Sequence, residues 1–297
     1  MVPETLILQI IGMGAVLIYS LLGEIISERS GVVNLSIEGS IAFSAATSYA
    51  ITIAYHNPLI GLLFGVLSGI IPSIFMTLTS VYMPLNMIVS GIVFSSIFSA
   101  ASIVVGNSVP RLPQERLVFI NENTTLMIIF LSAVSSAIVL KLFIRRRIGL
   151  LIRSAGEDPY SAYSLGINPW RIRMFGLIFS GAMGGLTGSL LTLSPMISMI
   201  WRENITAGTG FIIVAVTPST LWDPIIAIFI GIFFGSIPLI SIYLQTSGMM
   251  FSAELASLLP YLIALSLYII FRIVLAKRSG LVPRALGKEI VLEERYE

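Results

Sequence analysis

The longest uncharged stretch places the strongest constraint on how this chain folds. No Asp, Glu, Lys or Arg occurs from Gly39 to Pro110, a run of 72 residues. A helix needs about 20 apolar residues to cross a bilayer, so this run is long enough for about three crossings. The segments 56–58 and 82–84 each end in proline and are the natural turns within it. The run therefore predicts a chain folded inside a membrane.

The overall composition supports a membrane protein and excludes several other classes. Hydrophobic residues make up 56% of the chain and charged residues 11%, and the mean hydropathy is +0.96. Because soluble domains carry about 25% charged residues, a soluble enzyme, a disordered protein and a fibrous repeat are excluded. The chain has no cysteine, which rules out disulfide frameworks, thiol catalysis and cysteine-ligated metals.

The remaining apolar windows predict helices. They run over 174–201, 204–222, 224–253 and 255–271, and they lack the period-two alternation of an outer-membrane barrel. We therefore predict an all-α membrane protein, a polytopic bundle of about nine transmembrane helices (eight to ten), with residues 1–297 forming one membrane domain. The expected spans are 6–22, 35–55, 59–80, 84–105, 124–144, 174–195, a short 207–221, 224–243 and 254–273.

The basic residues predict the orientation of the bundle. Twelve of the seventeen Lys and Arg residues fall in two segments: Lys141, Arg145, Arg146, Arg147, Arg153, Arg171, Arg173, Arg272, Lys277, Arg278, Arg284 and Lys288. By the positive-inside rule, the loop 145–173 and the tail 274–297 are cytosolic. The loop 106–123 has balanced charge and is expected outside. Counting back through the spans places the N-terminus outside, on a retained first span that no basic segment precedes.

The cytosolic loop 145–173 contains the signals of a short helix. Asp158 followed by Pro159 fits an N-cap with proline at the first helical position, and Gly166 is a natural stop. A helix over 159–165 is therefore expected, and Asn168-Pro169 should begin the next one. Ser154 with Glu157 offers a competing capping box one turn earlier.

The short helix has an apolar side although it is expected outside the membrane. Tyr160, Tyr163 and Leu165 lie on it, and two turns of helix are not stable alone. It must therefore pack either on its own bundle or in the groove of another protein, and both interpretations stay open at this point.

Glycines inside the predicted spans recur every four residues. The rows are Gly61, Gly65 and Gly69; Gly181 and Gly185; Gly184 and Gly188; and Gly231 and Gly235. Small residues at this spacing allow close helix crossing in lipid. They predict a tightly packed bundle and indicate no chemistry.

The segment 24–38 mixes charge with glycine and asparagine between two apolar runs. A carboxylate at membrane depth costs about 2.5–3.5 kcal/mol unless it is paired or faces water. The segment is therefore typical of a broken or re-entrant helix beside a substrate path, and on a helix Asn34 and Glu38 would share one face. The alternative is an ordinary cytosolic loop in which Arg29 pairs with Glu24 or Glu28.

A second polar cluster occupies residues 201–211, on the predicted external side. Trp201 fits an anchor at the membrane interface. Glu203 or Asn204 could instead contact an external partner or a substrate. The sequon formed by residues 204–206 carries little weight, because such matches are common by chance.

Recognisable catalytic and metal-binding motifs are absent from the sequence. It contains no Walker A motif, no HExxH and no paired His/Asp/Glu cluster, and His56, its single histidine, lies at a predicted external turn. We therefore expect no catalytic site, no bound metal and no cofactor on this chain, and nothing in its charge indicates a nucleic-acid partner.

Six segments of the chain, in order, resemble one family. They are GEIISERSGVVNLSIEG (23–39), AGEDPYSAYSLGINPWRIR (155–173), GAMGGLTGSLL (181–191), NITAGTGF (204–211), LWDP (221–224) and VPRALGK (282–288). Together they resemble permease subunits of ABC importers, in the simple-sugar and nucleoside branch of the ribose/branched-chain amino acid permease superfamily. The likeness extends from about residue 12 to residue 288.

The resemblance implies a function and a set of partners. Such permeases work as a pair, of identical or related chains, with two cytosolic ATPases and an extracytoplasmic solute-binding protein, and ATP and Mg are bound by the ATPases. The short helix would be the coupling helix that contacts the ATPase through Glu157, Asp158, Pro159, Tyr160, Tyr163, Leu165 and Gly166. The residues expected to line the substrate pathway are Asn34, Glu38, Asn86 and Asn204.

Three departures from the family pattern leave the solute open. Thr209 replaces an expected Arg, Met87 a Gln and Ser95 an Asn. We expect import of nucleosides or related simple sugars, driven by the ATPases. The alternative is a secondary transporter driven by an ion gradient, with Glu38 or Glu254 as its proton site.

Overall fold

The structure, a computed structural model, describes residues 4–83, 85–110, 117–118, 121–194, 201–246, 253–275 and 282–290. Within these ranges it is built from helices and their connections, without a strand. The α-helices are α1 (Glu4–Arg29), α2 (Ile37–Tyr55), α3 (Pro58–Thr77), α4 (Met87–Asn107), α5 (Glu122–Ile144), α6 (Arg147–Glu157), α7 (Pro159–Ser164), α8 (Pro169–Leu193), α9 (Thr209–Val216), α10 (Pro224–Thr246) and α11 (Ala253–Leu275). A π-helical turn, Leu78–Tyr82, follows α3, and a 3₁₀ turn, Thr217–Thr220, follows α9.

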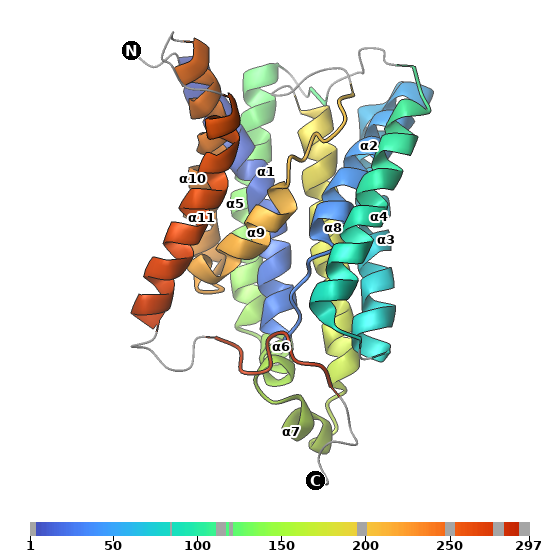
Figure 1. Ribbon diagram of the computed structural model, residues 1–297, viewed down its shortest axis with the longest axis vertical. Helices are drawn as coiled ribbons and strands as arrows, with labels where there is room; N and C mark the ends of the chain where they lie inside the picture. Colours follow the sequence, from blue (N-terminus) through green and yellow to red (C-terminus); the bar gives the residue numbers. More distant parts are fainter. Residues whose placement is uncertain are drawn as a thin grey trace.

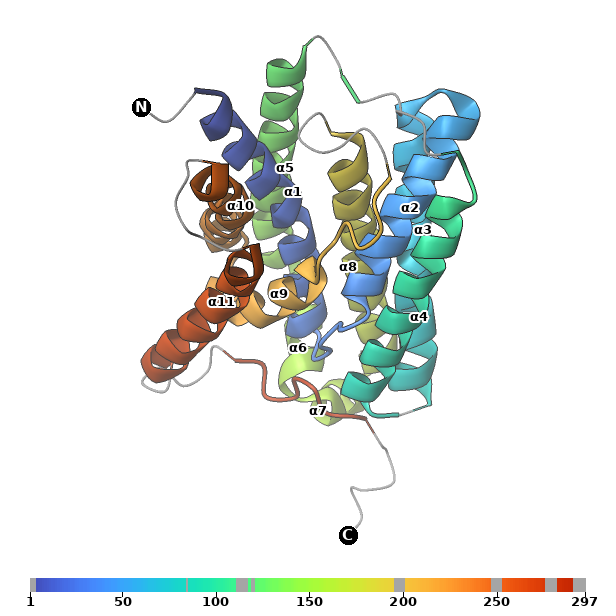
Figure 2. The same ribbon diagram turned by 45° about the horizontal axis from the view of Figure 1, so that its top comes forward.

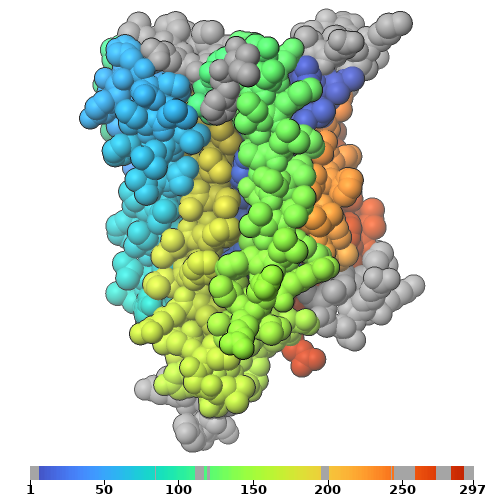
Figure 3. Space-filling model, turned by 180° about the vertical axis from the view of Figure 1, so that it is seen from behind, coloured from blue at the N-terminus to red at the C-terminus, as the bar shows by residue number. Residues whose placement is uncertain are grey.

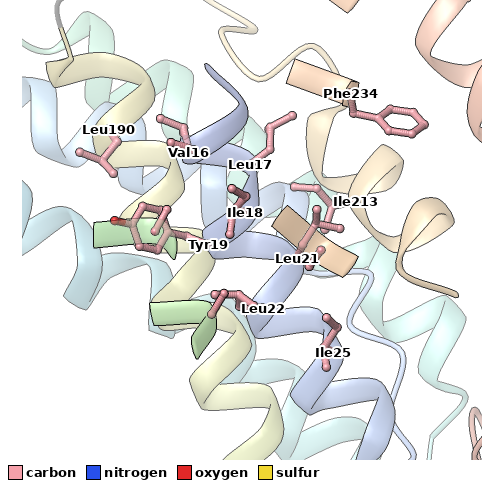
Figure 4. Close-up of a cluster of buried hydrophobic side chains, with 14 of the residues drawn as sticks. Val16, Leu17, Ile18, Tyr19, Leu21, Leu22, Ile25, Leu190, Ile213 and Phe234 are labelled. Atoms are coloured by element: carbon pink, nitrogen blue, oxygen red, sulfur yellow. The ribbon is translucent and has the colours of Figure 1, made fainter. Parts of the chain in front are cut away.

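Helix α1 forms the centre of the bundle (Figures 1 and 2). It packs against α5, α8 and α10, while α2 packs against α3, α4 and α8. Its side chains Val16, Ile18, Leu21 and Ile25 are buried in the largest apolar cluster, which also holds residues of α8, α9 and α10 (Figure 4). Helix α1 carries Glu24 and Glu28, which would be costly against lipid, and this explains why it lies inside the bundle.

The predicted membrane helices are confirmed. Six helices among the described residues are long and apolar enough to cross a membrane: Ile7–Arg29, Pro58–Tyr82, Met87–Asn107, Glu122–Ile144, Pro169–Leu193 and Pro224–Ser241. Two shorter apolar helices, Thr209–Thr220 and Leu258–Phe271, accompany them, and with α2, which is less apolar, the described residues contain about nine such helices, in line with the predicted eight to ten.

The predicted short span 207–221 is not a continuous membrane helix. Helix α9 has eight residues and rises only about 12 Å, which is less than half the thickness of a hydrocarbon core. The preceding segment 201–208 descends from the upper end of the bundle to the start of α9 near mid-height (Figure 1). The seventh pass is therefore part loop and part helix.

The four-residue glycine rows pack helices together, as predicted. An added Cβ at Gly69 would meet the backbone of Gly185 between α3 and α8. One at Gly235 would meet Gly14, where α10 crosses α1. These contacts bring the backbones of neighbouring helices together and leave no room for side chains.

The segment 24–38 is a broken helix, and not an ordinary loop. Helix α1 continues to Arg29, residues 32–34 have no regular secondary structure, and α2 begins only at Ile37. Gly31 makes the turn with φ +97°, where a side chain would also meet the Arg173 guanidinium. The prediction that Asn34 and Glu38 share a helix face is wrong, because Asn34 precedes α2.

The short helix of the 145–173 loop is confirmed as α7. The Asp158 side chain accepts hydrogen bonds from the N–H groups of Tyr160 (3.1 Å) and Ser161 (3.0 Å). Helix α7 ends at Ser164, one residue earlier than predicted, before Gly166 at φ +82°. The competing capping box does not form, because Ser154 lies inside α6.

The two basic segments meet at one end of the bundle. The Gly287 N–H donates to the Gly31 carbonyl (3.0 Å), and the Ala285 N–H donates to the Gly156 carbonyl (2.8 Å). The buried Arg173 donates to the Lys288 carbonyl at 2.7 Å. The start of α1 lies at the opposite end (Figure 1). Several residues named above lie outside the described residues: Pro84, Arg111, Glu115, Arg116, Lys277 and Arg278. The side chains of Glu254 and Arg272 lie outside them as well.

Candidate functional site: carboxylates at the helix breaks

Glu38 joins the two helix ends that lie inside the bundle. Its Oε2 accepts from the Gly210 N–H at 2.6 Å, and its Oε1 accepts from the Thr206 hydroxyl at 2.5 Å and the Gly208 N–H at 3.2 Å. The side chain is 5% exposed. Because the first N–H groups of a helix lack partners within it and carry partial positive charge, a carboxylate is well matched to the start of α9. Glu38 therefore fixes α9 to the first turn of α2.

The loop that leads into α9 is held in an unusual backbone conformation. Asn204 and Ala207 have φ values of 57° and 45°, and Gly208 has 79°. Left-handed conformations in non-glycine residues are strained and cluster at functional sites. The Tyr261 hydroxyl of α11 donates to the Ala207 carbonyl at 3.1 Å, so α11 also holds this loop.

Glu24 stabilises the non-helical segment between α1 and α2. Its Oε1 accepts from the Asn34 N–H at 2.8 Å, and its Oε2 accepts from the Ser180 hydroxyl of α8 at 3.0 Å. The Asn34 amide donates to the Ser180 oxygen (3.0 Å) and to the Ser73 oxygen (3.4 Å). Glu24 and Asn34 are fully buried. The break is therefore fixed by a network that reaches α3 and α8, and it satisfies backbone groups that would otherwise be orphaned in lipid.

Glu28 has a partner that sequence reasoning missed. Its Oε2 accepts from the Trp222 indole N–H at 2.6 Å, and both side chains are buried. Leu221 and Trp222 have φ values of 54° and 53°, so this contact holds a strained turn before α10. In the sequence, LWDP (221–224) contributes only to the family resemblance. Its one physical signal is a tryptophan beside a charged residue between two apolar segments.

The same turn carries an ion pair. Asp223 accepts a hydrogen bond from the Lys141 ammonium group of α5. Burial raises the pKa of Asp223, but the hydrogen bonds from Lys141 and the Ile225 N–H and the positive charges of Lys141 and Arg29 outweigh burial, so that the pKa lies below its ordinary value. The pair therefore links α5 to the start of α10.

The four predicted pathway residues do not all come together. Asn34 and Glu38 are buried near the break, and Asn204 is exposed in the loop whose Thr206 binds Glu38. Asn86 is exposed and caps α4, accepting from the N–H groups of residues 88 and 89. The assignment of these four residues to a substrate path stays a prediction.

The helix breaks lie toward the face that Figure 1 shows. There α9 lies between α4 on one side and α11 on the other. A Cβ at Gly39 would meet Ser95 of α4, and Tyr261 of α11 contacts the loop before α9. This face carries polar helix ends at mid-height, and α4, which borders it, has exposed apolar side chains, among them Ile88, Val89, Ile92 and Val93.

The predicted coupling residues lie at the basic end and differ in exposure: Asp158, Tyr163, Leu165 and Gly166 are exposed, Glu157 and Tyr160 are partly buried, and Pro159 is buried. Tyr163 is 47% exposed and Leu165 is 80% exposed, and the Tyr163 ring packs edge-on against Trp170 with 5.4 Å between ring centroids. Glu157, Asp158, Pro159 and Tyr160 line a groove of about 490 Å³ together with residues 284, 285, 288 and 289 of the C-terminal segment. Helix α7 thus packs on its own bundle through Trp170 and still presents an apolar end.

Two other sequence predictions have clear outcomes. Trp201 is not an interfacial anchor: it is 2% exposed and packs against Gly106 and Tyr49. His56 lies at an exposed turn after α2, as predicted. No group of three or more His, Asp or Glu residues that could hold a metal occurs in the described part of the chain.

Comparison with known proteins decides the family. A family model described as "Branched-chain amino acid transport system / permease component" matches residues 6–270. The chain belongs to this family. Its members are permease subunits, which are generally not catalytic, and in ABC transporters they work with ATPases and binding proteins.

Three curated relatives have related names. The guanosine ABC transporter permease protein NupQ of Bacillus subtilis is 28% identical, with 79% of each chain covered. The nucleoside ABC transporter permease protein NupC of Lactococcus lactis is 26% identical, with 74% of this chain and 76% of the relative covered. A putative glucose ABC transporter permease, TsgC13 of Haloferax volcanii, is 27% identical, with 70% and 68% covered. No solved structure matches the chain.

Proposed function

We propose that this chain is the membrane-spanning subunit of an ABC importer that takes up nucleosides or related simple sugars. The observation that carries the proposal is the family match over residues 6–270, together with relatives whose names specify guanosine, nucleosides and glucose. The broken helices near mid-height fit this function, because transporters place their substrate sites beside interrupted helices.

The substrate path runs along the face formed by α4, α9 and α11, where a second permease, identical or related, completes it. Glu38 and Asn34 hold the helix ends that border this path, and Asn204 and Asn86 lie on its exposed side. The apolar side chains of α4 that face outward there are suited to contact a second permease.

The ATPase binds at the basic end of the bundle. Its contact surface comprises Tyr163 and Leu165 of the α7 segment and the groove beside Glu157. ATP-driven closure of two ATPases would move these segments and switch the path between outward and inward access. ATP and Mg belong to the ATPase, and this chain binds neither.

The orientation places the basic end in the cytosol, so that the N-terminus is outside and the C-terminus inside. The basic residues of the loop 145–173 and the segment 282–290 meet at this end, which is the arrangement that the positive-inside rule favours. An extracytoplasmic solute-binding protein then delivers the solute at the opposite end, near the start of the 201–208 loop.

Uptake by cells that lack the gene tests the substrate class. Radiolabelled guanosine, ribose and glucose are supplied to the parent, the deletion strain and the complemented strain. We expect the deletion to remove high-affinity uptake of at least one of these solutes, and an excess of unlabelled guanosine to compete if that solute is a nucleoside. Unchanged uptake of all three would contradict the proposed substrate class.

A further inference from the structure

A groove runs along the side of the bundle opposite to that of Figure 1. Figure 3 shows it between α8, in yellow, and α5, in green, with α1 visible in blue at its floor. Its volume is about 290 Å³, and its lining includes Leu22, Val139, Phe143, Phe175 and Phe179. None of the carboxylates at the helix breaks lines it, so it is separate from the candidate site.

The wall of the groove offers no free polar group for a solute. Ser135 and Ser136 of α5 also line it, but their hydroxyls donate to the Ser132 carbonyl, at 2.9 Å and 2.7 Å. Serine hydroxyls bonded within their own helix in this way leave the outer surface apolar. The groove therefore suits a hydrocarbon chain.

Positive charge lies at the lower end of the groove. On α8, Arg171, Phe175, Phe179 and Met183 follow one another at four-residue spacing and therefore form one stripe. On the other wall, α5 ends at Ile144, directly after Phe143, and the exposed arginines at 145–147 follow it. Arg171 is exposed as well. The two walls of the groove thus lead to four exposed arginines, at residues 145, 146, 147 and 171, which we call the arginine cluster.

We propose that this groove binds an anionic phospholipid, with an acyl chain between α5 and α8 and the phosphate at the arginine cluster. The guanidinium fork matches phosphate oxygens, and basic pockets at the ends of membrane helices bind anionic head groups. A second copy of this chain fits less well, because a symmetric contact across the groove would bring the same arginines of both copies together. The assignment is independent of the transported solute.

Native mass spectrometry of the purified full-length chain tests the site, with dioleoyl phosphatidylglycerol and dioleoyl phosphatidylcholine as probes at equal concentration. We expect retention of phosphatidylglycerol in preference to phosphatidylcholine. Arg171→Gln should weaken phosphatidylglycerol retention about fivefold, the loss of one basic contact. Arg153→Gln is the matched charge control, since Arg153 lies on α6, where it pairs with Glu157, and belongs neither to the α8 stripe nor to the arginines at 145–147.

A second variant tests the acyl-chain part of the site. Ser136→Phe fills the groove and should remove the preference for phosphatidylglycerol over phosphatidylcholine. If the Ser136→Phe protein does not fold, Ser135→Phe is the second variant to measure. The matched control is Ser96→Phe on α4, where an exposed serine also bonds within its own helix, to the residue 92 carbonyl at 2.9 Å. Equal retention of both lipids, equal effects of Arg171→Gln and Arg153→Gln, or full retention in the folded groove-filling variant would each overturn the proposal.

Discussion

Glu38 is the residue on which the inner ends of two helices depend. It accepts three hydrogen bonds from the loop and first turn of α9 while it belongs to the first turn of α2. A single charged side chain therefore sets the position of α9, which is too short to be stable by itself.

Replacing this carboxylate with an amide should loosen α9. Glu38→Gln places an NH₂ group, which is a donor, against the backbone N–H donors of α9, so that a hydrogen bond is lost. Hydrogen bonds to charged groups contribute about 1.5–3 kcal/mol. We expect the free energy of unfolding to fall by about 2 kcal/mol and solute uptake to be lost, as measured by thermal unfolding and by transport assays. Glu203→Gln, which changes an exposed carboxylate bonded to Asn107, is the control, and an equal effect of both variants would contradict the role of Glu38.

The Asp223–Lys141 pair predicts a pH dependence. Folding lowers the pKa of Asp223, so the pair stabilises the fold at pH values above the ordinary aspartate pKa of about 4, and this stability is lost as the pH falls through the lowered pKa. Because the pair is partly exposed, its contribution is about 0.5–1 kcal/mol.

Asp223→Asn tests this dependence. The variant should melt at a lower temperature than the parent protein near neutral pH, and the difference should shrink on acidification to about pH 3. Melting curves of both proteins at the two pH values give the comparison. A difference that stays constant with pH would show that the charge of Asp223 is not responsible.

At this scale the sequence located the carboxylates but not their partners. Glu24, Glu28 and Glu38 stand out because charges at membrane depth are costly. The contact between Glu28 and Trp222 joins positions 194 residues apart, and no local pattern encodes such a pairing. The anchor role of Trp201 was wrong for a similar reason: Gly106, far along the chain, makes the space that the indole fills.

The positions of the helices were largely predictable from the sequence. For the helix breaks, the sequence predicted that a break occurs but not the backbone conformation within it. Charge-free windows and prolines delimit nine passes, and Asp158-Pro159 with Gly166 delimits α7. The register of the 30–36 segment depends on tertiary hydrogen bonds to Glu24 and Ser180. Spacing along the sequence therefore placed Asn34 and Glu38 wrongly on one helix face.

Helix α7 predicts where transport and ATP hydrolysis are coupled. Leu165 is 80% exposed, so Leu165→Asp should leave the fold unchanged while it disrupts an apolar contact with the ATPase. We expect co-purification of the ATPase to fall at least tenfold and uptake to stop. Tyr55→Asp is the control, because it puts the same charge on an exposed aromatic position (63%) at the start of the α2–α3 turn. Normal co-purification of the Leu165→Asp protein would contradict the coupling surface.

At the scale of the whole molecule, the arrangement of charge predicts the topology. The chain has no cysteine, so Ser164→Cys and Tyr55→Cys each introduce one labelling site, at opposite ends of the bundle. A membrane-impermeant maleimide added to intact cells should label the cysteine at position 55 and leave the one at position 164 unlabelled until the cells are opened. The reverse pattern would invert the proposed orientation.

The central claim is that ATP hydrolysed by a partner drives transport through this chain. The most direct measurement is uptake of radiolabelled solute into vesicles that contain the chain and its partner ATPase, with the ATP supply and the ion gradient varied separately. We predict uptake that requires ATP, stops with vanadate and persists with an uncoupler. Uptake that continues without ATP or the ATPase and collapses with the uncoupler would contradict the account and favour a secondary transporter.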